Sequence, residues 1–291
     1  MNQALPEWLL EDVRQARKGA GRQPIEETDR LIARFGLATV CRSARCPNRG
    51  ACFSERTATF LILGEVCTRR CTFCAVRHGP PSTPDEDEPR RVALTIAALG
   101  LKHVVITSVT RDDLPDGGAR HFAAVVGKVR RQCPGGKIEV LVPDFGGSEA
   151  AFQIVAASGP DVLAHNLETV PRLYETVRRG ADYRRSLDLL KRSKDAFPSM
   201  VTKSGLMLGL GEQDAEIEEV LSDLAGVRCD MVTLGQYLAP SPFHAPVSRY
   251  LSREEFEAWR AKAEGLGFRS VASGALVRSS YKAPIFFKGL A

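Results

Sequence analysis

Three cysteines, Cys67, Cys71 and Cys74, stand close together with the spacing C-x-x-x-C-x-x-C. Cysteine thiolates are the usual ligands of iron-sulfur clusters, and a cubane cluster used only for electron transfer has a cysteine on each of its four irons. Three cysteines leave one iron open. An open iron can chelate a small molecule through amino and carboxylate groups, so the spacing predicts a cluster that does chemistry on a bound ligand.

A second set of three cysteines, Cys41, Cys46 and Cys52, precedes the first with the longer spacing C-x-x-x-x-C-x-x-x-x-x-C. The two sets are separated by an apolar run, which predicts two clusters rather than one. The alternative is zinc, which also binds short-spaced cysteines. Zinc sites favour C-x-x-C pairs, however, and only Cys71 and Cys74 form one. A zinc-stabilised, weakly basic nucleic-acid-binding module therefore stays as the alternative from another class.

Composition favours metal ligation over disulfides for these cysteines. Residues 1–15 contain Glu7, Glu11 and Asp12 and no long apolar run, so they predict neither a signal peptide nor a membrane span. We expect a cytoplasmic protein with no membrane partner, and a reducing compartment disfavours disulfides. The formal charge of +5 is mild and does not demand a nucleic-acid partner.

Short apolar runs alternate with longer amphipathic segments, which is typical of repeated β-α units around a parallel sheet. The expected strands are Ala58 to Gly64, His103 to Thr107, Lys137 to Val142, Asp161 to Ala164, Val201 to Leu208 and Met231 to Gly235. The expected helices are Leu94 to Leu99, Gly118 to Arg131, Ser148 to Ala157, Tyr183 to Phe197, Asp214 to Ala225 and Ser252 to Glu264. Pro80 to Glu88 is interpreted as a surface connection.

Polar and glycine-rich clusters follow the expected strands, where a barrel would carry its functional residues. They are Ser108 to Gly118, Pro143 to Gly147, His165 to Thr169 and Gly209 to Glu212. Six units would form an α/β fold of the incomplete (β/α)6 TIM-barrel type. Periodicity alone also allows a doubly wound open sheet.

The shorter-spaced triad, placed after the first expected strand, is identified as the signature of radical S-adenosylmethionine (SAM) enzymes. The stretch from Thr39 to Cys74, TVCRSARCPNRGACFSERTATFLILGEVCTRRCTFC, further resembles lipoyl synthases, in which the longer-spaced triad is distinctive. The resemblance continues through SVTRDDLPDGGA, HNLETVPRLYETVRRGADYRRSLDLL, KSGLMLGLGE, TLGQYLAPS and VRSSY.

The resemblance implies three parts. Residues 1–56 are expected to be an N-terminal extension with the longer-spaced triad, residues 57–265 the radical SAM partial barrel, and residues 266–291 a C-terminal extension that folds over the barrel mouth. In this family a serine of the R-S-S-Y segment is the fourth ligand of the auxiliary cluster. The matching residue is Ser280, with Ser279 as the alternative.

The resemblance also implies the activity. Two [4Fe-4S] clusters and SAM would insert two sulfur atoms at C6 and C8 of a protein-bound octanoyl-lysine, with the sulfur taken from the auxiliary cluster. Hydrogens on such carbons have no useful acidity, so a radical route is reasonable and no catalytic residue beyond the cluster ligands is expected. The expected partners are an octanoylated carrier, either a 2-oxoacid dehydrogenase E2 component or the glycine cleavage H protein, and ferredoxin or flavodoxin as electron donor. The enzyme is expected to be a monomer.

Three residues are candidate SAM contacts. Asn166 and Glu168 follow the fourth expected strand, although Asn166 could instead cap a helix that begins near Val170. Phe73, between two cluster cysteines, is expected either to contact adenine or to pack beneath the loop. The glycines of Gly209 to Glu212 and the charged residues Arg111 to Asp113 keep both a functional and a purely structural interpretation.

Two other radical sulfur-inserting enzymes are weighed against this assignment. A biotin synthase is expected to carry a differently ligated second cluster within the barrel. A methylthiotransferase would need an added nucleic-acid-binding domain, for which a chain of 291 residues has no length.

Overall fold

The computed structural model describes residues 4–288, which divide into two compact units. The N unit comprises Val13–Arg69 and Ala75–Leu163, and the C unit comprises Met1–Asp12, Arg70–Cys74 and Ala164–Ala291. The first helix, α1 (Glu7–Lys18), has residues in both. None of the helices within residues 4–288 has the length and hydrophobicity that a membrane crossing requires.

The strands of the N unit follow the order β1-β2-β5-β6-β7. Strand β1 (Ala38–Thr39) is antiparallel to β2 (Thr59–Ile62), whereas β5 (His103–Ser108) is parallel both to β2 and to β6 (Lys137–Leu141). Strand β7 (Val162–Ala164) ends one residue inside the C unit. The N unit also contains a small parallel pair, β3 (Val66–Cys67) and β4 (Arg77–His78).

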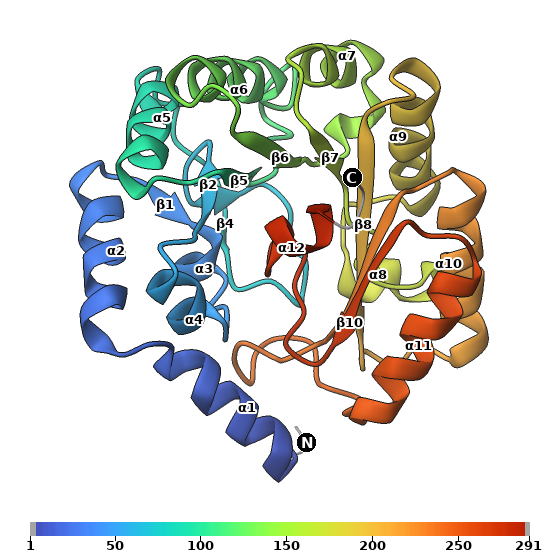
Figure 1. The fold of residues 1–291 in the computed structure, drawn as a ribbon. Helices are drawn as coiled ribbons and strands as arrows, with labels where there is room; N and C mark the ends of the chain where they lie inside the picture. The colour runs from blue at the N-terminus through green and yellow to red at the C-terminus, as the bar shows by residue number, and fades with distance from the viewer. Residues whose placement is uncertain (1–3, 289–291) are drawn as a thin grey trace. The chain divides into compact units, whose positions relative to one another are not determined.

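The N unit contains helices before and between its strands, and the last three of these helices along the chain lie on the outer side of the strands (Figure 1). The helices of the N unit are α2 (Arg22–Arg34), α3 (Val40–Ser43), α4 (Arg49–Ser54), α5 (Glu88–Leu99), α6 (Ala119–Gln132), α7 (Glu149–Ala157) and a single 3-10 turn, η1 (Phe145–Gly147). Helix α5 begins six residues before the predicted start. Its second residue, Pro89, has the φ angle and missing N–H that suit a first helical turn, so the predicted connection ends at Asp87.

In the C unit, β8 (Val201–Leu208), β9 (Met231–Gln236) and β10 (Ser270–Gly274) form a parallel sheet. Its helices are α8 (Tyr174–Val177), α9 (Tyr183–Ala196), α10 (Asp214–Gly226), α11 (Arg253–Gly265) and α12 (Ala283–Lys288), with a 3-10 turn, η2 (Pro171–Leu173), before α8. Helices α9, α10 and α11 lie outside the sheet, and α12 lies on its other side (Figure 1). Every residue of β9 is buried, as expected for a parallel strand covered on both faces.

The six predicted strands are all present, and the fold is α/β with a mostly parallel arrangement of strands. Several elements are additional. Strand β10 is a further strand of the C unit, and α1 to α4 show that residues 7–54 are largely helical. Both features matter for the site, because α3 and α4 carry the longer-spaced triad and β10 leads into the R-S-S-Y segment.

Candidate active site

The longer-spaced triad is gathered within the N unit. Cys41 lies in α3, Cys52 in α4, and Cys46 in the turn between them, where its N–H donates to the Cys41 carbonyl over 3.2 Å. Burial raises the pKa of Cys41 to about 11, with a further rise from Cys46, against a lowering by hydrogen bonds from Thr59. Burial also raises the pKa of Cys52, and Cys41 and Cys46 add to it. The three sulfurs are therefore close enough to influence one another's ionisation.

The helices before the triad hold α4 in place. The Thr28 hydroxyl donates to the Phe53 carbonyl over 2.7 Å, and the Ala20 N–H donates to the Ser54 hydroxyl over 2.8 Å. Asp29 pairs with the guanidinium groups of Arg42 in α3 and Arg49 in α4. The N-terminal helices thus fix the two short helices that carry Cys41 and Cys52.

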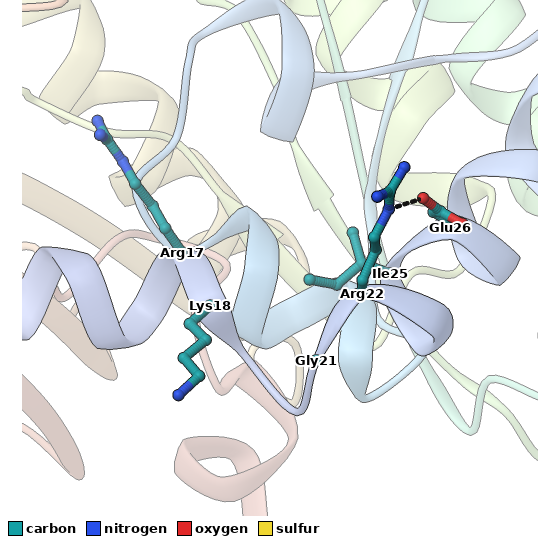
Figure 2. Close-up of a pocket in the computed structure, with 6 residues that line it drawn as sticks. All are labelled: Arg17, Lys18, Gly21, Arg22, Ile25 and Glu26. Carbon is teal, nitrogen blue, oxygen red and sulfur yellow. Dashed lines mark hydrogen bonds and ion pairs between the residues drawn. The ribbon is translucent and has the colours of Figure 1, made fainter.

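A pocket lies at the turn between α1 and α2 (Figure 2). It is lined by Arg17, Lys18, Gly21, Arg22, Ile25 and Glu26, and Arg22 pairs with Glu26. None of the predicted site residues lines this pocket. We assign it no part in the chemistry.

The shorter-spaced triad is divided between the two units. Cys67 ends β3 in the N unit, where its sulfur accepts a hydrogen bond from the Thr110 N–H over 3.3 Å. Cys71 and Cys74 belong to the C unit and share a turn in which the Cys74 N–H donates to the Cys71 carbonyl over 3.2 Å. Among residues 4–288, no three His, Cys, Asp or Glu side chains are arranged as ligands of a single metal ion. The ligands of a cubane cluster bind different irons. A cubane therefore does not require three side chains arranged around one metal ion.

Arg69, which the sequence analysis did not single out, links the loop after Cys67 to two strand ends. Its guanidinium donates to both oxygens of Asp112, after β5, and to both oxygens of Asp144, after β6, over 2.6–3.0 Å. The Asp144 side chain is fully buried, and that of Arg69 is 10% exposed. Such fork-to-carboxylate contacts are strong and directional. Two sequence features could have identified Arg69: it lies between cluster cysteines, and two strand-end loops contain acidic residues.

Of the neighbouring charged residues, Asp112 and Asp113 are exposed, whereas Arg111 is buried. Arg111 is 1% exposed and donates to the Leu63 carbonyl over 3.1 Å. It also pairs with Asp113, whose pKa is lowered mainly by the hydrogen bond from Arg111. Arg111 therefore ties the strand-end loop after β5 to the end of β2.

Asn166 and Glu168 lie at the end of β7 in the C unit, and the structure brings them together with the C-terminal segment. The Asn166 amide nitrogen donates to the Glu168 carboxylate over 3.0 Å and to the Ser279 hydroxyl over 2.6 Å. Asn166 is 7% exposed, and its amide oxygen is buried and has no hydrogen-bond partner among residues 4–288. The helix-cap alternative is wrong, because η2 begins at Pro171 after Val170 and no side chain caps it.

The Glu168 carboxyl group combines burial with nearby positive charge. Burial raises its pKa above the ordinary value, against a lowering by the charges of Arg178 and Arg278 and by the hydrogen bond from Asn166. The backbone φ of Glu168 is +67°, a conformation that a residue with a side chain rarely adopts. Strained backbone of this kind clusters at functional sites.

The remaining candidates also lie in the C unit. Phe73 is partly buried and packs against an apolar cluster of Val177, Leu210, Tyr237 and Val247, as its packing interpretation requires. Gly209 has a φ of +100°, and a Cβ there would meet the Gln236 side chain at 2.3 Å and the Arg249 carbonyl at 2.4 Å. Glycine is therefore required at this strand-end turn for steric reasons alone.

The chain was compared with known proteins. The model of the radical SAM superfamily matches residues 61–224. A lipoyl synthase of Caldanaerobacter subterraneus subsp. tengcongensis is 51% identical over 280 residues, covering 96% of each chain. One of Trichlorobacter lovleyi is 54% identical over 282 residues, covering 97% of this chain and 98% of the relative. The chain belongs to the lipoyl synthase family.

Solved structures agree on the fold. The FeFe-hydrogenase maturase HydG of Carboxydothermus hydrogenoformans has a TM-score of 0.53 at 13% identity, over 89% of this chain and 66% of its own. A second HydG structure reaches a TM-score of 0.59 at 13% identity, covering 100% of this chain and 71% of that one. At such identities the likeness concerns the fold alone.

Membership of the lipoyl synthase family establishes the reaction. These radical SAM enzymes insert sulfur at C6 and C8 of an octanoyl group on a lipoyl-carrier protein, and they use SAM and two [4Fe-4S] clusters. The zinc-module, biotin synthase and methylthiotransferase alternatives are thereby excluded.

Proposed function

We propose that the two triads divide the chemistry of lipoyl synthesis between two clusters. Cys67, Cys71 and Cys74 hold the cluster that binds SAM, and Cys41, Cys46, Cys52 and Ser280 hold the auxiliary cluster. When bound, the first cluster supplies the electron that cleaves SAM to a deoxyadenosyl radical, and the second supplies sulfur. The mutual influence of Cys41, Cys46 and Cys52 supports the second ligand set.

The contact between Asn166 and Ser279 is the observation that carries the proposal. It joins a strand-end site to the R-S-S-Y segment inside one unit. The buried, unpartnered oxygen of Asn166 and the carboxylate of Glu168 are both acceptors, and SAM offers hydroxyl and ammonium donors. We assign these two residues to SAM, with the partly exposed ring of Phe73 against adenine.

Ser280 is the fourth ligand of the auxiliary cluster in this proposal. Its carbonyl accepts from the Ala283 N–H, but within residues 4–288 its hydroxyl makes no hydrogen bond. The Ser279 hydroxyl, by contrast, is already bonded to Asn166. This difference supports Ser280 over Ser279.

The finer partners are also proposals. The carrier is the E2 component of a 2-oxoacid dehydrogenase or the glycine cleavage H protein, the electron donor is ferredoxin or flavodoxin, and the enzyme works as a cytoplasmic monomer without nucleic acid or membrane. The chain is organised as an extension (1–56), the partial barrel (57–265) and a C-terminal extension (266–291), of which residues 1–3 and 289–291 lie outside the described structure.

Removing each triad in turn tests the division of labour. Anaerobically reconstituted wild type should hold about eight irons in two cubanes. Changing Cys67, Cys71 and Cys74 together to Ala should leave one cubane and abolish SAM cleavage. Changing Cys41, Cys46 and Cys52 to Ala should also leave one cubane, but cleavage should persist while an octanoyl-lysine peptide gains no sulfur. The measurements are iron content, deoxyadenosine release and mass spectrometry of the peptide. Equal loss of cleavage in both variants would contradict the division.

A further inference from the structure

Arg178 is a buried cation that the proposed chemistry does not use. It directly follows α8 and is 8% exposed. Its guanidinium donates to the Tyr174 hydroxyl over 2.8 Å and to the Ser186 hydroxyl over 3.0 Å, and lies 3.2 Å from His165 Nε2. It also reaches the Leu167 carbonyl over 3.5 Å.

None of these partners is a carboxylate, and within residues 4–288 Arg178 forms no salt bridge. Burying a cation without an opposite charge is costly, so such groups are normally paired. The negative group that interacts electrostatically with Arg178 is Glu168, which lies beyond hydrogen-bond contact. The position of this cation is therefore best explained by what it does to Glu168 and to the backbone beside it.

Two of the contacts fall on the residues that flank Asn166. Arg178 approaches the ring of His165 on one side and the carbonyl of Leu167 on the other. The Tyr174 hydroxyl donates to the same Leu167 carbonyl over 2.9 Å. Arg178 thus contacts the segment His165–Glu168 on both sides of Asn166 and helps to hold it in place.

The segment needs such support because Glu168 is strained. Its φ of +67° persists only where the surroundings fix it. The Glu168 N–H donates to the Gly205 carbonyl, and its own carbonyl accepts from the Met207 N–H, so its backbone is bonded to β8. With Leu167 held by Arg178 and Tyr174, the direction of the Glu168 side chain is determined.

We propose that Arg178 is a positioning residue for SAM, which holds the His165–Glu168 segment and supplies a positive charge facing the Glu168 carboxylate. This inference rests on the assignment of Asn166 and Glu168 to SAM. A carboxylate accepts hydrogen bonds from the cofactor only through its lone pairs, and the ionised form makes the stronger bonds. Arg178 acts on SAM through Glu168 and does not itself touch it.

The groups that face Glu168 decide how it responds to pH. Arg178, after α8, and Arg278, from the C-terminal segment, favour the ionised carboxylate, and Asn166 donates to it. Tyr174, in α8, is neutral and has its own pKa raised by burial. Without Arg178, the pKa of Glu168 would rise further, so a larger share of the carboxyl group would be protonated at any given pH.

The test uses the reconstituted full-length enzyme with dithionite, and it measures deoxyadenosine release against SAM concentration. Arg178→Met should raise the KM for SAM about tenfold or more, while kcat at saturating SAM changes little. Arg178→Lys keeps the charge and should restore part of the affinity. Arg179→Met removes the adjacent exposed arginine and should match wild type.

The pH dependence separates positioning from a purely structural role. In Arg178→Met, the KM for SAM should fall as pH rises across the range in which the enzyme is stable, because the Glu168 carboxyl ionises again. In wild type, it should change much less over that range. Equal losses at every pH, or a fall in kcat together with a lower melting temperature, would overturn the proposal.

A double variant distinguishes this inference from the SAM assignment. If Arg178 acts through Glu168, Arg178→Met with Glu168→Gln should bind SAM no worse than Glu168→Gln alone. If the increases in the KM for SAM of the two single variants multiply in the double variant, the inference is contradicted. If Asn166→Ala and Glu168→Gln both leave the KM for SAM unchanged, the SAM assignment itself fails. If they raise it but Arg178→Met does not, only the role of Arg178 fails.

Discussion

The adjacent residues Ser279 and Ser280 differ in the hydrogen bonding of their hydroxyl groups, and this difference matters for sulfur transfer. A hydroxyl oxygen is a hard ligand beside soft thiolates and should hold iron less firmly than sulfur does. Weak ligation is useful where a cluster must give up its sulfide. Ser280 has an uncommitted hydroxyl within the described residues, whereas the Ser279 hydroxyl bonds to Asn166.

Ser280→Ala should therefore still bind iron and cleave SAM but form little or no lipoyl product. Ser279→Ala should be milder in product formation. Ser280→Cys should give a robust cluster that surrenders sulfur poorly, because a thiolate binds iron more firmly. Deoxyadenosine release and mass spectrometry of an octanoyl-lysine peptide measure the two steps separately. A Ser280→Ala enzyme with wild-type product yield would remove the ligand assignment.

Arg69 is the residue on which the loop after Cys67 depends. Replacing it by Gln leaves the buried Asp144 without its cation, and breaking such a buried pair costs about 3–5 kcal/mol. Arg69→Gln should lower the melting temperature and the iron content after reconstitution. Arg70→Gln, a change at the next, exposed position, is the matched control and should do neither. Normal iron retention in Arg69→Gln would show that the loop needs no such clamp.

At the scale of elements, Asp230 ties three parts of the C unit together. It directly precedes β9, and its carboxylate accepts from Lys194 in α9 over 2.9 Å and from the Thr202 N–H in β8 over 2.8 Å. It also pairs with Arg269, before β10. These contacts lie at the amino ends of the strands, the end of a barrel that serves stability rather than catalysis.

Asp230 should make stability depend on pH. Burial raises its pKa, but Lys194, Thr202 and Arg269 lower it more, so the folded value is below the ordinary one. Its stabilising effect is therefore present above the unfolded pKa of about 3.9 and lost as pH falls through the folded value.

Asp230→Asn should cost about 3–5 kcal/mol at neutral pH, because it leaves the buried Lys194 without its partner. The gap in melting temperature between the variant and wild type should close below about pH 4. Asp195→Asn, an exposed acid of α9, is the control and should change stability little. A gap that does not depend on pH would rule out the electrostatic explanation.

Whether a strand could be predicted depended on its amino-acid composition. Strand β5 (HVVITS) is rich in Val and Ile, and β6 (KIEVL) and β8 (VTKSGLML) also contain Val, Ile or Leu, which parallel strands need where both faces are buried. Strand β10 has the sequence SVASG, and its small residues have weak strand preference. It is a strand because it pairs with β9 over five residues, which is a tertiary cause.

At the scale of the whole molecule, the sequence indicates candidate cluster ligands but not the residues that hold them in position. The candidate cluster cysteines can be recognised in the sequence because their local spacing indicates a cluster. Asn166 and Ser279 are 113 residues apart, and Arg69 and Asp144 are 75 apart. Contacts of that kind depend on the folded chain and leave no local pattern. The role of Arg178 was missed for the same reason.

A contact between the two ends of the sequence in the C unit has a consequence for how the chain is made. Arg253 pairs with Asp12, 241 residues away, and stacks over the ring of Trp8 at 5.0 Å. Ribosomes add about 5–20 residues per second, so Asp12 waits on the order of 10–50 s for its partner to be synthesised. During that interval the segment around the buried Leu9 has no completed unit to fold into. The C unit therefore closes on its first residues only late in translation, when the start of the chain has long left the ribosome.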